Sequence, residues 1–207
     1  MGNEVKCQVR SGKQESEGKA LLETSEIIFR GGFRLKLPFA TILSAKVVSD
    51  ELQLQTADGV AIFQLGAATA AKWCEKILHP KTRIEKLGIK PGTKVSLIGF
   101  EDQDEEFLKE LQKTEAVMTA AKNGLPKECD CILLRTDTKQ QLAQVAKIAR
   151  KMLGAVALWI IYPKGQKHIT EGDVFAAGHK AGLTDIKVVG FSATHTALKF
   201  VIPVKKR

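Results

Sequence analysis

The apolar run at residues 155–162 (AVALWIIY) constrains the fold more than any other part of this sequence. Eight apolar or aromatic residues follow one another here, between Gly154 and Pro163. An apolar run without alternation is typical of a strand buried on both faces, as the strands of parallel sheets are. A helix is disfavoured because the run is short, contains two isoleucines and ends at a proline. We therefore expect a strand in the middle of a covered sheet.

Strands and helices alternate around this run. Strands are predicted at residues 95–98, 117–120, 130–135, 155–162, 186–191 and 197–204. Apolar periodicity predicts helices near residues 107–111, 138–153 and 170–181, the last two opened by capping-box spacings. Because such alternation requires right-handed crossovers, we expect a mainly parallel, Rossmann-like α/β sheet. Its last two strands, joined by a short connection, are expected to form an antiparallel pair.

Residues 1–79 have a different pattern, made of short β-rich runs. In residues 33–37, apolar side chains alternate with Arg34 and Lys36, which predicts a strand with one face in water. Gly31 and Gly32 separate two such runs, which predicts a two-residue hairpin turn with positive φ. Residues 67–78 then place Ala70, Trp73, Cys74 and Ile77 on one helical face. We expect a small antiparallel β domain of six or seven strands with one C-terminal helix.

This order of elements, over residues 3–79, resembles pleckstrin-homology-like (PH-like) domains. In lipid-binding members of that superfamily, a basic cluster in the first hairpin loop binds the phosphoinositide head group. The corresponding loop here, taken as residues 11–18, carries Glu15 and Glu17 against Lys13. Two carboxylates argue against an anionic-lipid site, so a protein contact or packing against the second domain is the expected role. Residues 80–86 are charged and proline-marked, and are predicted to link domain 1–79 to domain 87–207.

Three segments in the second part carry a further likeness. They are LGIKPGTKVSLIGF, DCILLRTDTKQQLAQVAKIARKMLGAVALWIIYPKG and AGLTDIKVVGFSATHTALKFV. In this order they resemble an uncharacterised bacterial family of small Rossmann-like domains, over residues 87–201. That resemblance implies a fold and no reaction.

More distantly, the same order of strands resembles the S-adenosylmethionine-dependent methyltransferase fold. Methyltransferases follow the first strand with a Gly-rich loop that lets the backbone approach the cofactor. This chain instead has Gly99-Phe100-Glu101-Asp102-Gln103-Asp104, and no acidic residue ends a second strand to hold a ribose. No cofactor is therefore predicted, and S-adenosylmethionine or nucleotide binding is kept as the alternative.

The charge of the chain is +9 and lies mostly in its second part. Residues 1–85 contain 12 basic and 10 acidic residues, a net charge of +2, whereas residues 86–207 contain 20 and 13, a net charge of +7. The basic residues are dispersed apart from the tail 205–207, and no RNA-recognition signature is present. Specific nucleic-acid binding is not expected. If the basic second part did bind nucleic acid, its affinity would fall steeply as the salt concentration rises.

Several classes of protein are disfavoured by absent signals. The sequence contains no P-loop, no G-x-S-x-G elbow and no H-E-x-x-H motif, so no catalytic residue is assigned. Cys129 and Cys131 alternate along a strand and point to opposite faces, which is poor geometry for zinc. No metal is predicted. Without a spanning apolar stretch or a signal peptide, a cytoplasmic protein that does not bind membranes is expected.

The candidate ligand site follows from the rule that open α/β sheets bind ligands beyond the carboxyl ends of their strands. It is expected beside the strands at 95–98 and 130–135. Its predicted residues are Gly99, Phe100, Arg135, Thr136, Asp137, Tyr162, Lys164 and His195. Arg135 and Lys164 are suited to a phosphate or carboxylate, unless Arg135 instead pairs with a neighbouring acid.

Two hypotheses about function remain. The leading one is a non-catalytic binding or regulatory protein for a protein partner or a small anionic ligand. The rival is an S-adenosylmethionine- or nucleotide-binding enzyme with an atypical first loop. Stabilisation by one of these cofactors is the observation that separates them.

Overall fold

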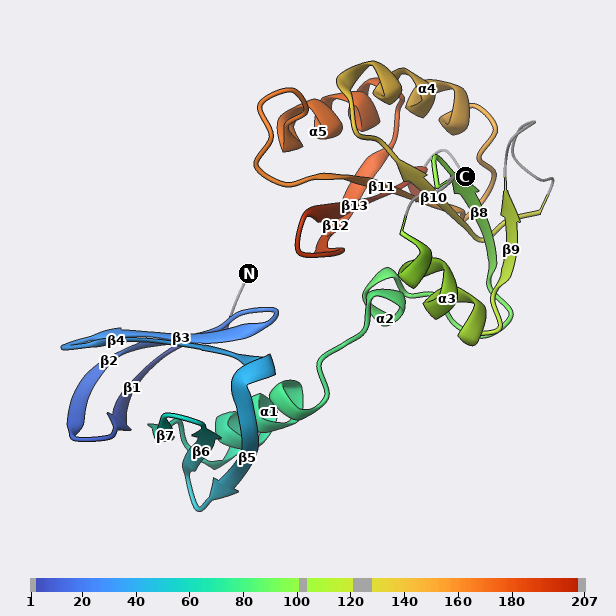
Figure 1. Ribbon diagram of the computed structural model, residues 1–207. Coiled ribbons are helices and arrows are strands. Elements are labelled where there is room, and N and C mark those ends of the chain that lie inside the picture. The colour runs from blue at the N-terminus through green and yellow to red at the C-terminus, as the bar shows by residue number, and fades with distance from the viewer. Residues whose placement is uncertain (1–2, 101–103, 121–127, 205–207) are drawn as a thin grey trace. The chain divides into compact units, whose positions relative to one another are not determined.

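The computed structural model describes residues 3–100, 104–120 and 128–204. The chain divides into two compact units, Met1–Lys81 and Thr82–Arg207 (Figure 1). Their strand pairings agree in general terms with the expected α/β organisation, an antiparallel sheet followed by a mixed sheet with helices. Within the described residues, no helix is long and apolar enough to cross a membrane.

The described part of the first unit contains an antiparallel sheet, one α-helix and a 3-10 turn at Phe39–Thr41. Its strands are β1 (Asn3–Ser11), β2 (Gln14–Leu22), β3 (Glu26–Gly31), β4 (Arg34–Pro38), β5 (Ile42–Val48), β6 (Glu51–Thr56) and β7 (Gly59–Gln64). They are ordered β4-β3-β2-β1-β7-β6-β5. Helix α1 (Ala67–Leu78) buries the four residues predicted for its apolar face against this sheet. The prediction of this helix is confirmed.

The first hairpin differs from its prediction. Only residues 12–13 form the turn, and β2 begins at Gln14, so the predicted loop 11–18 is mostly strand. Gln8 and Arg10 of β1 lie opposite Glu17 and Glu15 of β2, on the solvated face of the sheet. Because β2 carries polar or small residues as far as Lys19, apolar alternation does not reveal where it starts.

The glycines at the β3–β4 hairpin serve close packing, and the prediction of positive φ is wrong. Neither Gly31 nor Gly32 has a positive φ. A Cβ on Gly31 would lie 2.6 Å from the ring of Phe29 and 2.7 Å from the carbonyl oxygen of Glu17. Gly18, which pairs with Gly31, has the same constraint from Phe29. The buried aromatic ring therefore requires both strands to lack side chains beside it.

The second unit contains a mixed six-stranded sheet. Its strands are β8 (Lys94–Ile98), β9 (Val117–Ala120), β10 (Cys131–Arg135), β11 (Ala157–Pro163), β12 (Thr184–Gly190) and β13 (His195–Val201). Their order is β12-β13-β11-β10-β8-β9, with β8, β9, β10 and β11 parallel and β13 antiparallel to both of its neighbours. The predicted antiparallel pair of final strands is confirmed.

Helices cover both faces of this sheet (Figure 1). The helical elements are α2 (Arg83–Leu87), α3 (Glu105–Lys113), the 3-10 turn at Lys139–Leu142, α4 (Ala143–Ala149) and α5 (Glu171–Lys180). One core lies between the sheet and α4 and α5, and the other lies between the sheet and α2 and α3. Strand β11 contributes to both cores, and its residues from Ala157 to Tyr162 are all buried. The prediction of a central buried strand is confirmed.

Helix α2 occupies much of the stretch predicted as a linker. The Thr82 hydroxyl accepts a hydrogen bond from the Glu85 backbone amide, and the Glu85 carboxylate accepts one from the Thr82 amide at 2.8 Å. This capping box satisfies amides that a five-residue helix would otherwise expose. Gly88 ends the helix in the left-handed conformation. Residues 83–87 therefore form part of the second unit.

The start of α5 gives a prediction about acid stability. The pKa of Asp173 falls from 3.8 to about 2 because Lys139 and both donors of Thr170 bind its carboxylate. A lowered pKa stabilises the fold above the unfolded value, and this contribution is lost as pH falls through the folded value. Asp173→Asn should therefore destabilise the protein at pH 7, with a difference that shrinks between pH 4 and pH 2. Denaturant unfolding at each pH measures it, and a difference independent of pH would contradict the assignment.

Candidate functional site

The candidate site lies where the sheet reverses its order. From β8 the chain passes through α3 to β9 on one side, and then returns to β10 on the other side of β8. Connections that leave in opposite directions open a space beyond the carboxyl ends of the two strands, where ligands of open α/β sheets bind. Gly99 follows β8 and Arg135 ends β10, so these two residues lie at the switch point.

Gly99 and Phe100 have structural roles at this position. Gly99 has φ +76°, and a Cβ there would lie 2.7 Å from the carbonyl oxygen of Arg135. Its lack of a side chain is therefore explained by the neighbouring strand, with no ligand required. Phe100, predicted on the rim of the site, is 5% exposed and lies 5.8 Å from the ring of Phe107, between ring centroids. Residues 101–103 of the predicted first loop lie outside the described residues.

Arg135, Asp137 and His195 form a compact cluster at the switch point. The Arg135 Nε atom donates to the Asp137 carboxylate at 3.3 Å. His195 Nε2 lies 3.2 Å from Arg135 Nη2 and 3.3 Å from Asp137 Oδ1. The alternative in which Arg135 pairs with a neighbouring acid is thus the one observed. His168 joins the cluster because its Nε2 lies 3.1 Å from the Asp137 carbonyl oxygen.

The protonation of His195 decides which of these contacts is a hydrogen bond. A guanidinium only donates, so an unprotonated Nε2 accepts from Arg135. Nδ1 then carries the proton and donates to Thr194 Oγ1, which lies 2.8 Å away. With Nε2 protonated, His195 instead donates to Asp137 and faces Arg135 as a second donor. The tautomer of His195 therefore decides whether Nε2 accepts from the arginine or donates to the carboxylate.

Three lysines add positive charge near the loop before His195. The Lys164 ammonium donates to the Ser192 carbonyl oxygen at 2.7 Å, in the loop before His195. The pKa of Lys86 is lowered by burial and by the charge of Lys164. Lys187 donates to the Lys86 carbonyl oxygen at 3.0 Å. Lys164 and Lys187 thus both donate to carbonyl oxygens.

Thr136 and Tyr162 lie outside the cluster of charged groups. Thr136 is fully buried, and its amide and hydroxyl both contact the Ile161 carbonyl oxygen. Tyr162 packs in the core beneath α4 and α5, and its hydroxyl donates to Glu171 at 3.1 Å. Burial and the nearby Glu171 carboxylate raise the pKa of Tyr162. Both residues hold neighbouring elements in place.

Thiols and metals offer no further chemistry in the described part of the chain. Burial raises the pKa of Cys7 to about 11 and that of Cys131 to about 12. These thiols stay protonated at neutral pH and are poor nucleophiles. Cys129 and Cys131 pack in different cores, on opposite faces of the sheet as predicted. Within residues 3–100, 104–120 and 128–204, no three His, Cys, Asp or Glu side chains are placed to hold a metal ion.

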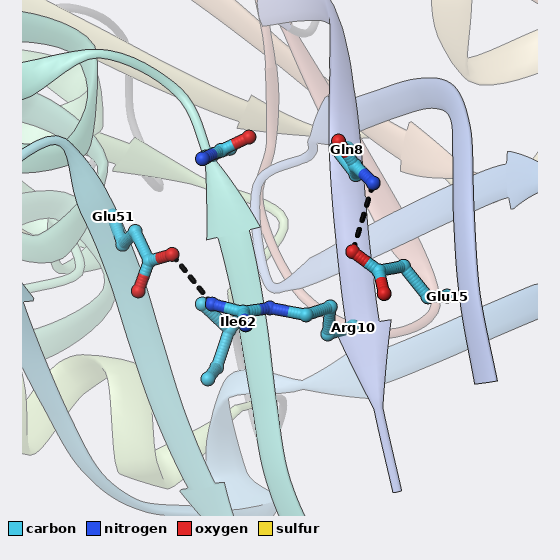
Figure 2. Close-up of a pocket in the computed structure, with 6 residues that line it drawn as sticks. Gln8, Arg10, Glu15, Glu51 and Ile62 are labelled. Atoms are coloured by element: carbon cyan, nitrogen blue, oxygen red, sulfur yellow. Dashed lines mark hydrogen bonds and ion pairs between the residues drawn. The ribbon is translucent and has the colours of Figure 1, made fainter. Parts of the chain in front are cut away.

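A small polar pocket of about 120 Å³ lies on the solvated face of the first unit. Figure 2 shows Arg10 of β1 reaching across β7 to Glu51 of β6, at 2.6 Å, while Gln8 donates to Glu15 at 2.8 Å. Glu51 also accepts from Gln53 at 3.2 Å. Because these groups bind one another, the pocket is explained as a solvated network of cross-strand pairs.

Sequence reasoning did not find Lys86, since it was placed in the linker. The signal that could have revealed it is the capping-box spacing of Thr82 and Glu85. Nor did it place His195 and Asp137 in contact. These residues are 58 positions apart, and their proximity depends on the pairing of β11 with β13.

Comparison with known proteins gives only distant structural similarity. No family model and no curated protein matches the sequence. The N-terminal PH domain of human ARAP2 gives a TM-score of 0.33 at 10% identity, covering 38% of this chain and 77% of that chain. A SAM-dependent methyltransferase from Aquifex aeolicus gives 0.41 at 15% identity, covering 58% and 87%. The magnesium protoporphyrin IX methyltransferase from Synechocystis PCC 6803, with bound SAM, gives 0.36 at 15% identity, covering 55% and 71%. Similarities at these TM-scores carry no argument about function.

Proposed function

We propose that this protein is a non-catalytic binding protein whose second unit takes a small anionic ligand at the β8–β10 switch point. The observation that carries the proposal is that Arg135, at the end of β10, contacts His195, while Lys164, directly after the parallel strand β11, binds Ser192 in the loop before His195. Both residues lie at the carboxyl edge of the sheet, which is the edge where open α/β sheets bind their ligands. The chemical class that fits is a phosphate or carboxylate.

The charge distribution around the site supports an anion. Asp137 offsets the charge of Arg135, but Lys164 binds a carbonyl oxygen. The lowered pKa of Lys86 reflects burial and repulsion from Lys164. An anion near both amines would relieve that repulsion.

Lys164→Met tests this proposal. Pyrophosphate should bind the wild-type protein in an isothermal titration at low salt, and Lys164→Met should weaken binding about tenfold because one charged hydrogen bond is lost. Lys167→Met, which removes another exposed lysine from the same loop, is the matched control. Equal loss in both variants, or no wild-type binding, would reject the site.

A second candidate is an S-adenosylmethionine- or nucleotide-binding enzyme. The sheet order favours it. Dinucleotide-binding folds place their ligand at a switch point of the sheet, and this sheet has one between β8 and β10. Two observations disfavour this candidate. The close approach of Arg135 already explains the glycine at position 99, and Phe100 is buried. A thermal shift with S-adenosylmethionine, S-adenosylhomocysteine and nucleotides separates the candidates. Stabilisation by one of these at sub-millimolar concentration, without stabilisation by pyrophosphate, would favour the enzyme.

A further inference from the structure

Another pocket of the second unit lies at the edge of the sheet opposite the proposed anion site. It is bordered by α2, by the loop that leads into β8 and by the end of α3. Because α2 and this loop precede β8, and the end of α3 precedes β9, the pocket lies at the amino ends of these parallel strands. Its volume is about 510 Å³. This is within the range of pockets that hold small ligands.

The pocket has an apolar floor. Ile84 of α2 and Ile89 of the following loop line it while being 5% and 4% exposed, so their side chains are fixed in the core. Pro91 continues this surface and is itself exposed. A rigid apolar surface beside solvent favours the burial of a hydrocarbon or aromatic group.

The rim of the pocket carries charges of both signs, but the acids already have partners. Glu110 binds Arg83 at 2.9 Å, and Glu85 caps α2 through Thr82. Lys90 and Lys113 enter the rim from two different elements. Among the residues that the structure describes, neither lysine ammonium has a carboxylate within ion-pair distance. Lys90 and Lys113 are therefore the charged rim residues that have no ion pair among the described residues.

We infer that this pocket binds a small amphiphilic carboxylate, with its apolar part on Ile84, Ile89 and Pro91 and its carboxylate between Lys90 and Lys113. The two ammonium groups favour an apolar body with one anionic group, because a cation would be repelled by both. This site is independent of the anion site at the switch point. Neither its floor nor its rim includes a residue of that cluster.

Decanoate is the probe that tests the inference, used below its micelle concentration on the isotope-labelled full-length protein. Saturable changes in the amide resonances of residues 82–93 and 110–114 are expected. Decyltrimethylammonium has the same chain and the opposite charge, and it should not saturate these resonances. Equal effects of the two probes, or changes confined to other residues, would overturn the inference.

Charge reversal at the rim provides the matched variants. Lys90→Glu and Lys113→Glu are both at exposed positions, so the fold should be retained. Each should weaken decanoate binding about threefold, and the double variant about tenfold. Lys147→Glu, at an exposed position on α4 outside the pocket, should leave it unchanged. Equal loss in the control would indicate net charge alone and would reject the site.

Discussion

Arg83→Met is expected to lower the free energy of unfolding of the second unit by about 2 to 3 kcal/mol, because it leaves three carboxylates without their cation. The guanidinium binds Asp104 at 3.0 Å, Glu110 at 2.9 Å and Glu106 at 3.4 Å. Its side chain is 15% exposed, and its centre lies 5.3 Å from the Phe107 ring. One residue of α2 therefore holds α2 against α3, with the like charges of α3 gathered around it.

Hydrogen exchange of the β11 amides, recorded at increasing denaturant concentration, measures this effect in the second unit. Arg83→Lys keeps the charge but loses the planar fork, so it should recover only part of the stability. Lys109→Met breaks an exposed pair with Glu105 on the same helix and should cost less than about 0.5 kcal/mol. A loss for Arg83→Met as small as that of Lys109→Met would contradict the role given to Arg83.

Gly178→Ala is expected to destabilise the second unit by about 2 kcal/mol, although alanine is the better helix former by about 1 kcal/mol. A Cβ on Gly178 of α5 would lie 2.1 Å from the Phe200 ring. Phe200 is fully buried in the core beneath α4 and α5, so its ring has no free space to move into. Overpacking should therefore outweigh the gain in helix propensity.

Gly172→Ala, in the same helix, is the control for Gly178→Ala. Its Cβ would meet only Thr170 Oγ1, at an ordinary 3.7 Å. This variant should be neutral or slightly stabilising in the same denaturation measurement. If both alanine variants were neutral, the helix would have to sit farther from β13 than described.

Burial on one or two faces made parts of the fold predictable. An unbroken apolar run predicts the central strand β11, and four apolar residues at helical spacing predict α1. Elements made mostly of polar residues were harder to predict. The first half of β2 faces water on one side and carries few apolar residues on the other, so it appeared to be a loop. Helix α2 is only five residues long, too short for periodicity to reveal.

The composition of the candidate site was less predictable than its location. Gly99 and Arg135 could be placed at the carboxyl edge because both lie at the ends of predicted strands, and the structure has them at the ends of β8 and β10. Contacts between Arg135, Asp137 and His195 depend on strand register over 60 positions, which no local pattern encodes. Phe100 was expected at the rim, but packing against Phe107 of α3 buries it. Local sequence does not show which helix covers a side chain.

The proposed anion site can be located by titrating pyrophosphate into the isotope-labelled full-length protein and following its amide resonances. Saturable shifts should gather at Gly99, at residues 135–137 and at residues 192–195, and they should vanish in high salt. Shifts that instead gather in the first unit, or that grow without saturation across the whole basic surface, would show that Arg135, Lys164 and His195 do not form a binding site.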